Sequence, residues 1–318
     1  MENQQDNQKV GWERELIEKI ALAAVTEQRR ARRWGIFFKS LMFLYLLAVL
    51  GVAFFPKLKQ EMGVDGSDHT AIIDLVGTIA ENKEVTAENV IESLRNAVKD
   101  KHTKGVILHA NSPGGSPVQS AYVYEEIRNI KKEHPNLPIF AVVSDICASG
   151  CYYIASAADK IYVSPASIVG SIGVIMDGFG FVDSMAKFGV ERRLITAGEH
   201  KALLDPFSPS KPDETEYMHG LLEQVHQQFI SAVKAGRGDR LKEFPEMFSG
   251  LVWTGEASVK LGIADDFGND DYVAKNIIGV KEKVNFTQQE RLLDKLAGKL
   301  GASFGHALGS FWQRILLK

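Results

Sequence analysis

The 318-residue sequence predicts an α/β fold whose sheet is largely parallel. Two observations support this: strand-like apolar segments alternate with helical ones along most of the chain, and no low-complexity linker divides them. Apolar residues make up 45% of the chain and charged residues 24%, as is typical of a globular protein. The net charge of −3 provides no basic field for nucleic acid, and no Cys or His spacing resembles a zinc site. We therefore expect no nucleic-acid partner, metal or cofactor.

Residues 34–55 form an apolar run of about the length that spans a bilayer, with Lys39 as the only charge. Four arginines lie within residues 29–33, against two lysines just after the run, so the N-terminus should stay cytoplasmic. A buried core helix and a cleaved signal peptide are the alternatives, although the long polar leader and the lack of an A-x-A site oppose the second. We expect a cytoplasmic segment over 1–33, a single-pass inner-membrane anchor over 34–55, and an extracytoplasmic domain beyond.

The outer domain is expected to cover residues 60–283. Its strands should be short apolar runs, and its helices should repeat apolar residues every three or four positions. On this basis we predict strands at 71–79, 105–111, 138–144, 161–165, 168–176 and 190–196, and helices at 87–100, 119–134, 180–188 and 213–235.

Ser149 lies in DICASGCYYIAS (145–156), where a predicted strand leads into a helix. A serine at this point is either the N-cap of the helix or a nucleophile at the positive end of the helix dipole. Gly150 favours the nucleophile, because it lets a substrate chain approach the backbone. Cys147 and Cys151 flank the serine. We expect two free thiols, with a bridge as the alternative if the local backbone allows it.

Two further segments contain residues suited to acyl-transfer chemistry. In NSPGGS (111–116), Gly114 and Gly115 can turn backbone N–H groups into a cavity and hold an oxyanion, or simply form an ordinary strand-to-helix turn. In GEHKALLDPFSP (198–209), Lys201 precedes an unusually apolar loop. Apolar surroundings favour the neutral amine that a general base requires, whereas a surface lysine has no such role. None of the eight histidines has a recognisable triad setting.

Taken together, the motifs resemble the signal peptide peptidase A family of membrane-anchored serine peptidases. SPGG, ASG with YYIA, GSIGV and G-x-x-K with a following SP occur in order, and residues 251–268 resemble the closing element of that family. The resemblance covers about residues 70–270. It implies a ClpP/crotonase-like fold of repeated ββα units and a Ser/Lys dyad that works without histidine.

Carried over by position, the resemblance makes Ser149 the nucleophile and Lys201 the general base. Gly114 and Gly115 match the oxyanion turn. Ser171 matches a serine that positions the lysine amine, although it could equally satisfy backbone groups at a strand end. Two positions depart from the family pattern: Cys151 replaces a glycine, and His109 replaces a residue that is usually apolar or basic.

The resemblance also implies the function. We expect an endopeptidase that hydrolyses remnant signal peptides at the membrane as a homo-oligomer. One alternative is a ClpP-like protease that cuts a specific membrane partner. Others are an acyl-CoA hydratase or hydrolase of the same fold and a catalytically inactive peptide-binding scaffold.

Both ends of the chain contain amphipathic segments. The tail (284–318) has an apolar stripe that includes Trp312, with basic residues on the other face. It could pack on a neighbouring subunit or lie on the outer leaflet as an interfacial helix that contacts lipid. In residues 1–33 the spacing of apolar residues predicts a short helix that lies on the inner membrane surface or contacts a partner. The alternative is a solvated leader without such a role.

Overall fold

A computed structural model of the chain describes residue 22 and residues 26–51 and 66–288. The chain divides into two units, residues 1–66 and 67–318. Most of the predicted cytoplasmic segment lies outside the described residues. So does the amphipathic tail from residue 289 onward, including Trp312.

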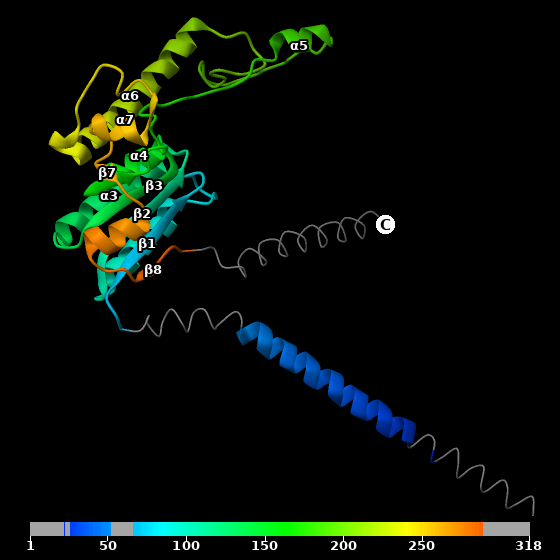
Figure 1. Ribbon diagram of the computed structural model, residues 1–318. Coiled ribbons are helices and arrows are strands. Elements are labelled where there is room, and N and C mark those ends of the chain that lie inside the picture. The colour runs from blue at the N-terminus through cyan, green and yellow to red at the C-terminus, as the bar shows by residue number, and fades with distance from the viewer. Residues whose placement is uncertain (1–21, 23–25, 52–65, 289–318) are drawn as a thin grey trace, which may run out of the picture. The chain divides into compact units, whose positions relative to one another are not determined.

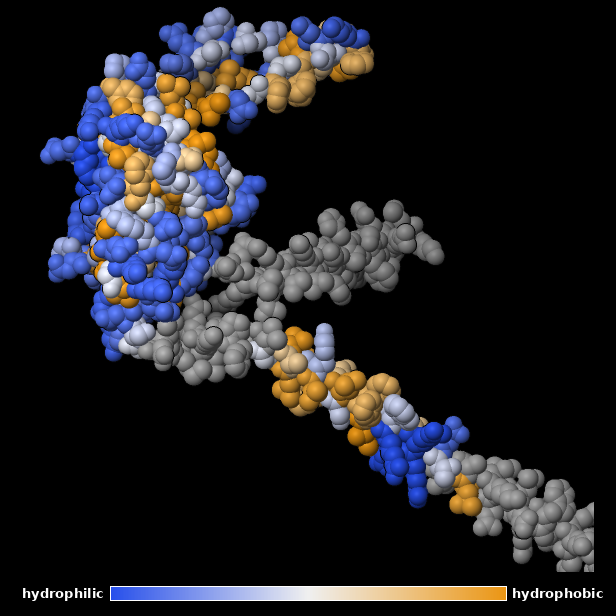
Figure 2. Space-filling model, in the orientation of Figure 1, coloured by the Kyte–Doolittle hydropathy of each residue, from blue (hydrophilic) through white to orange (hydrophobic). Residues whose placement is uncertain are grey.

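The first unit contains one described helix, Thr26–Gly51. By length and composition it could cross a membrane, and its side chains are exposed. Figure 2 shows the apolar side chains of this helix as a band next to a hydrophilic end. The helix begins before the apolar run and includes the arginines at 29–33, whereas residues 52–55 of the expected anchor lie outside the described part. These features support anchoring in a membrane.

The second unit is built on an eight-stranded sheet (Figure 1). The main path runs β6-β5-β3-β2-β1-β8, and β4 pairs with both β3 and β7. Every pairing is parallel except that of β5 with β6. The strands are β1 His69–Val76, β2 Thr103–Ser112, β3 Ile139–Ala148, β4 Lys160–Val163, β5 Ile168–Gly170, β6 Val252–Thr254, β7 Asp266–Phe267 and β8 Lys283–Asn285. The expected α/β fold with a largely parallel sheet is confirmed.

Helices occupy most of the connections between strands. They are α2 Ala87–Lys99, α3 Pro117–Glu133, α4 Gly150–Ala155, α5 Val182–Lys187, α6 Pro212–Arg237, α7 Gly255–Lys260 and α8 Asp270–Tyr272, with a 3-10 turn at Gly238–Arg240 and a π-helical turn at Val273–Ile278. Two of the long helices start at side-chain caps: Thr86 accepts from Asn89 N–H, and Ser116 accepts from Gln119 N–H, with Pro117 in the first turn of α3.

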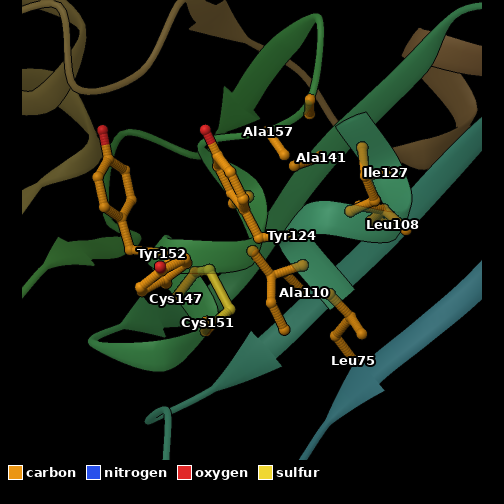
Figure 3. Packing of buried hydrophobic residues seen from close by; sticks show 14 of the residues in the cluster. Leu75, Leu108, Ala110, Tyr124, Ile127, Ala141, Cys147, Cys151, Tyr152 and Ala157 are labelled. Carbon is orange, nitrogen blue, oxygen red and sulfur yellow. A yellow bond between two sulfur atoms is a disulfide. The ribbon is translucent and has the colours of Figure 1, made fainter. Parts of the chain in front are cut away.

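Both faces of the sheet are covered, as is usual for parallel strands. Alternate residues of β1 and β2, such as Ile73, Leu75 and Leu108, enter the main core against α2, α3 and α4. The residues between them, such as Ile107, join Phe140 and Val142 in a smaller cluster on the other face. Figure 3 shows part of the main core around Cys147 and Cys151, with Tyr152 directly after Cys151 in the chain. The period-two alternation therefore separates the two cores.

One predicted strand is wrong and a second is shorter than expected. Residues 190–196 have a strand-like alternation but pair with no other strand in the described chain, and most of their side chains are exposed. Of residues 168–176, only 168–170 are in a strand, because pairing with β3 ends at Gly170. An alternating pattern in the sequence does not show whether a neighbouring strand is present for pairing. At the other end of the domain, the expected boundary at 283/284 falls inside β8, which pairs with β1.

Candidate active site

Ser149 lies between the end of β3 and the start of α4. Its backbone has φ 53° and ψ −122°, a conformation that a side-chain-bearing residue adopts only when its surroundings hold it there. The residue occupies the N-cap position, yet its side chain makes no capping hydrogen bond and is half-buried. The hydroxyl is therefore not used as a helix cap.

The backbone of Ser149 is held on both sides. Its N–H donates to Gly170 O of β5 at 2.8 Å, and its carbonyl accepts from Tyr153 N–H at 2.9 Å. Ala148 pairs with Gly170 across the two strands. These contacts fix the serine between the neighbouring strand and the first turn of α4.

The glycine turn at 114–115 packs directly against Ser149. A β-carbon added to Gly114 would lie 2.8 Å from Ser149 Cβ and 2.6 Å from Ala148 O, so only glycine fits there. Gly114 N–H donates to Ser112 Oγ at 3.1 Å and is therefore already used. Gly114 shapes the turn but does not present a free donor.

The free donors near Ser149 belong to Gly115 and Gly150. Neither N–H donates a hydrogen bond within the described residues, and Gly150 starts α4, where helix N–H groups lack internal partners. A β-carbon added to Gly150 would lie 3.2 Å from Gly115 N, so the two turns are in close contact. Gly150 is absent from the sequence-based site, although its place as first residue of a predicted helix signals a free N–H. This pair can hold an oxyanion beside the serine.

Ser171 comes directly after Gly170, the residue that binds Ser149 N–H. It has φ 53°, and its N–H donates to Leu251 O at 2.7 Å. Within the described residues its half-buried hydroxyl makes no hydrogen bond, so it does not satisfy backbone groups at the strand end. The structure thus places Ser171 one residue from the Ser149 contact.

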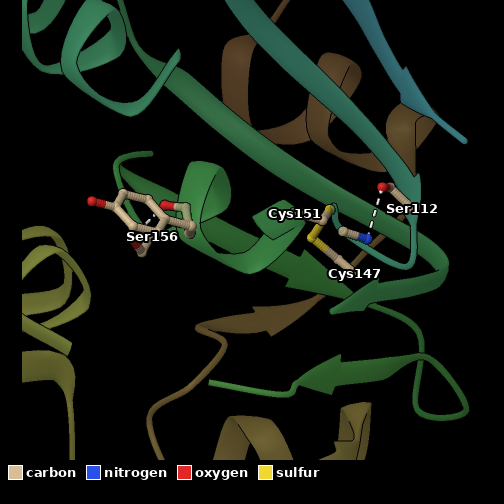
Figure 4. Close-up of a disulfide and its surroundings, with 6 residues drawn as sticks. Ser112, Cys147, Cys151 and Ser156 are labelled. Carbon is tan, nitrogen blue, oxygen red and sulfur yellow. Dashed lines mark hydrogen bonds between the residues drawn. A yellow bond between two sulfur atoms is a disulfide. The ribbon is translucent and has the colours of Figure 1, made fainter. Parts of the chain in front are cut away.

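The two cysteines form a disulfide, so the prediction of free thiols is wrong. Their Cα atoms are 5.1 Å apart, a separation that a disulfide spans without distortion. The sharp turn at Ser149 brings the end of β3 back toward the first turn of α4, which residue spacing alone does not show. Both cysteines are fully buried, next to Ser112 (Figure 4).

Lys201 makes no hydrogen bond to the residues around Ser149 in the described chain. It belongs to an exposed segment, residues 174–211, that we call the arm. The arm includes α5 and extends away from the sheet (Figure 1). Within the described chain, the exposed Lys201 ammonium makes no hydrogen bond or ion pair, and none joins it to Ser149. A single copy of the chain does not place this amine on the serine hydroxyl.

No described histidine hydrogen-bonds to Ser149. His109 instead belongs to a network on the smaller-core face of the sheet: its Nδ1 lies 2.7 Å from Asp270 Oδ2, and its Nε2 lies 3.3 Å from Ser144 Oγ. The hydrogen bond with Asp270 raises the pKa of His109, against an opposing effect of burial. This network links β2 and β3 to α8, away from the serine turn.

Comparison with known proteins shows which family the chain is similar to. Residues 131–284 match peptidase family S49. Over 213 residues, 67% of this chain, the sequence is 42% identical to a Brucella abortus protein named Na(+)/H(+) antiporter NhaA, and the match covers 29% of that protein. The chain thus spans less than a third of that relative, and we do not extend the antiporter name to it.

Relatives named as proteases match a larger share of their own length. A putative protease of Methanocaldococcus jannaschii, MJ0651, is 29% identical over 225 residues, covering 70% of this chain and 71% of that protein. A putative signal peptide peptidase SppA of Enterococcus faecium is 28% identical over 222 residues, covering 67% of this chain and 64% of that protein. The family match over residues 131–284, which includes the serine turn, and these protease relatives support a peptidase of family S49.

Proposed function

We propose that the protein is a serine endopeptidase with Ser149 as its nucleophile. The observation that carries this proposal is the Ser149 hydroxyl on a turn of positive φ, next to the N–H groups of Gly115 and Gly150, since none of the three donates a hydrogen bond within the described part of the chain. Ser149 Oγ attacks the carbonyl carbon of the scissile peptide bond, and the two N–H groups stabilise the negative charge that develops on the carbonyl oxygen. The amine product leaves with a proton, and water then hydrolyses the acyl-enzyme ester.

Lys201 is the proposed base that takes the proton from Ser149 Oγ and passes it to the leaving amine. A lysine acts as a base only when its amine is neutral, which requires removal from water. Lys201 is exposed and makes no contact with Ser149 within one copy of the chain. We therefore propose that the arm docks on a second copy, which buries the lysine and brings it to that copy's serine, with Ser171 helping to orient the amine.

The composition of the arm supports such an assembly. Several large apolar side chains are almost fully exposed, at 84% for Ile175, 77% for Phe179, 84% for Phe188 and 96% for Ile195. Figure 2 shows apolar surface gathered along the arm. Soluble proteins rarely leave a contiguous apolar surface of this kind uncovered, and a further copy of the chain provides a matching partner.

The proposed substrates are remnant signal peptides at the membrane. The apolar helix Thr26–Gly51, with its arginines at one end, supports a single-pass anchor in the inner membrane with the N-terminus cytoplasmic. The Cys147–Cys151 bridge supports an extracytoplasmic peptidase domain, because disulfides persist in oxidising compartments. The name of the Enterococcus relative points to the same substrate class.

A serine-reactive fluorophosphonate probe tests this function on the full chain in detergent. We expect the wild-type protein to be labelled at Ser149 and to hydrolyse apolar peptides, and we expect Ser149→Ala to lose both properties while keeping its thermal unfolding transition. A folded wild-type protein that resists the probe and cleaves no peptide would instead indicate a peptide-binding scaffold. Labelling that persists in Ser149→Ala would assign the nucleophile elsewhere.

A further inference from the structure

We infer that the Cys147–Cys151 disulfide is a positioning element of the active site: it holds the Ser149 turn against the glycine turn, and its reduction lowers turnover. This inference rests on the proposed function of Ser149.

The bridge closes around the nucleophile. Its half-cystines lie two residues before and two residues after Ser149, so the covalent loop 147–151 has the serine at its tip. Ser149 has φ 53°, which an L-residue holds only under constraint from its surroundings. The bridge joins the two segments whose directions define this conformation, the end of β3 and the first turn of α4.

Cys147 also connects the bridge to the other parts of the site. In the sheet it pairs with Ser112 of β2 on one side and with Val169 of β5 on the other. Ser112 Oγ accepts from Gly114 N–H and so holds the glycine turn, as Figure 4 shows beside the bridge. Gly170, the next residue of β5, accepts from Ser149 N–H. A shift of Cys147 would therefore move both the oxyanion donors and the serine.

The helix on the other side of the bridge is held mainly by packing, because all six of its residues are buried and Tyr153 stacks on Phe229. α4 has six residues and no side-chain cap, and a helix this short does not form by itself. Tyr152 anchors its outer side through a hydrogen bond from its hydroxyl to Ile263 O at 2.8 Å. The Cys151 bridge anchors the inner side, next to Gly150 N–H.

The position of the bridge argues for a local role over a global one. A disulfide stabilises a fold mainly by restricting the unfolded chain, and this effect is smallest for short loops. A bridge between residues four apart therefore contributes little in this way, whereas it fixes the conformation of the few residues inside it. We expect its loss to affect catalysis more than stability.

Reduction of the bridge proceeds by thiol–disulfide exchange with a dithiol. The dithiol thiolate attacks one sulfur of the bridge, and its second thiol resolves the mixed disulfide. Two cysteine thiols and one oxidised, cyclic reductant result. Both half-cystines are fully buried, so the reaction requires local opening and should be slow on the folded protein.

The test uses full-length protein in detergent micelles, with Cys147→Ala/Cys151→Ala, each single variant and Ser149→Ala. Thiol labelling under denaturing conditions, with and without prior reduction, first shows whether the bridge is present. Hydrolysis of a fluorogenic apolar peptide is then measured well below the unfolding temperature, to give kcat and KM separately. Wild-type protein is also assayed after dithiothreitol and after reoxidation.

We expect kcat to fall roughly 10-fold or more in the double variant, with KM nearly unchanged, because the reacting groups are displaced while the binding surface remains. Dithiothreitol should lower the wild-type kcat to the same level, and reoxidation should restore it. The double variant should not respond to reductant, since the chain has only two cysteines.

Three outcomes would overturn the inference. One is a protein that contains two free thiols, and a second is a double variant with wild-type kcat. The third is a fall in activity that only matches the loss of folded protein. Failure of the proposed function is distinguishable, because hydrolysis would then survive in Ser149→Ala or be absent from the wild-type protein.

Discussion

The serine turn and the arm carry the two halves of the proposed dyad, and they are built in opposite ways. Ser149 is held by a paired strand, a backbone hydrogen bond to Gly170, a glycine turn and a disulfide. Lys201 lies on an exposed segment with few contacts to the rest of the chain. The proposed nucleophile and oxyanion donors therefore lie together within one copy of the chain, whereas the proposed base has no such surroundings there.

The two regions are joined by α6. Its first turn is tied to the arm, since Glu214 accepts from Leu204 N–H and pairs with Lys211 at 2.8 Å. Its last turn is buried in the main domain, where the side chain of Arg237 is 0% exposed and contacts Asp265. The last turn of α6 is thus fixed in the main domain, while its first turn contacts the arm. This arrangement suits an arm that contacts a second copy of the chain.

The largest effect is expected at Lys201. Lys201→Ala and Lys201→Arg should each abolish peptide hydrolysis, because arginine keeps the charge but does not give up its proton. Lys187→Ala, another exposed lysine of the arm, is the matched control and should retain most of its activity. Steady-state kinetics on purified protein gives the comparison. Activity in Lys201→Arg close to that of the wild type would remove the lysine from the mechanism.

The glycine turn gives the next largest effect. A β-carbon at residue 115 would lie 2.0 Å from Ile79 O, so Gly115→Ala must displace the turn and its N–H. We expect kcat to fall by about 10²-fold or more. Gly220→Ala on α6, where an added β-carbon meets nothing within 4 Å, is the control and should behave like the wild type. Equal kcat values for the two variants would show that Gly115 N–H does not bind the oxyanion.

We expect fold stability to depend on the last turn of α6, which is buried in the main domain. Arg237 makes a bidentate contact with Asp265 at 2.7 and 3.1 Å while fully buried. Arg237→Ala leaves the carboxylate without this partner and should lower the free energy of unfolding by about 3–5 kcal/mol. Lys260→Ala, which breaks an exposed pair with Glu256, should change the free energy of unfolding far less, because solvent screens the pair. Urea unfolding measures both, and similar losses would contradict this assignment.

The smallest expected effect is a pH-dependent change in fold stability that comes from the hydrogen bond between His109 and Asp270. The hydrogen bond with Asp270 raises the pKa of His109, burial opposes it, and Asp74 and Lys283 add opposite charge effects. A raised histidine pKa stabilises the fold fully below the unfolded-state value, about 6.5, and this contribution is lost as pH rises through the folded-state value.

His109→Asn should therefore cost about 1 kcal/mol of unfolding free energy at pH 5.5, and less at pH 8.5. Urea unfolding of both proteins at the two pH values measures this difference. Since His109 is remote from the serine turn, kcat should be unchanged in the variant. A stability difference that grows with pH would mean that the sign of this coupling is reversed.

Sequence reasoning succeeded where a local pattern is enough. The apolar runs of β1, β2 and β3 and the helical periodicity of α2 indicate their elements directly. The roles that the resemblance gives to the glycine turn, Ser149 and Ser171 stay predictions. It failed where the outcome depends on a partner. Residues 190–196 alternate like a strand but have no strand beside them, and β6 to β8 have two or three residues each, too few for a period. The disulfide depends on a backbone reversal at Ser149 that spacing does not show.

The most direct test of the account is complementation between two inactive variants of the full chain. Ser149→Ala and Lys201→Ala are produced separately and together with different tags, and mixed assemblies are isolated through both tags. If one copy supplies the serine and another the lysine, assemblies mixed at random from equal amounts and isolated through both tags should regain about a quarter to a half of the wild-type activity, depending on the number of copies. Mixed assemblies that contain both variants and remain inactive would contradict a site shared between copies.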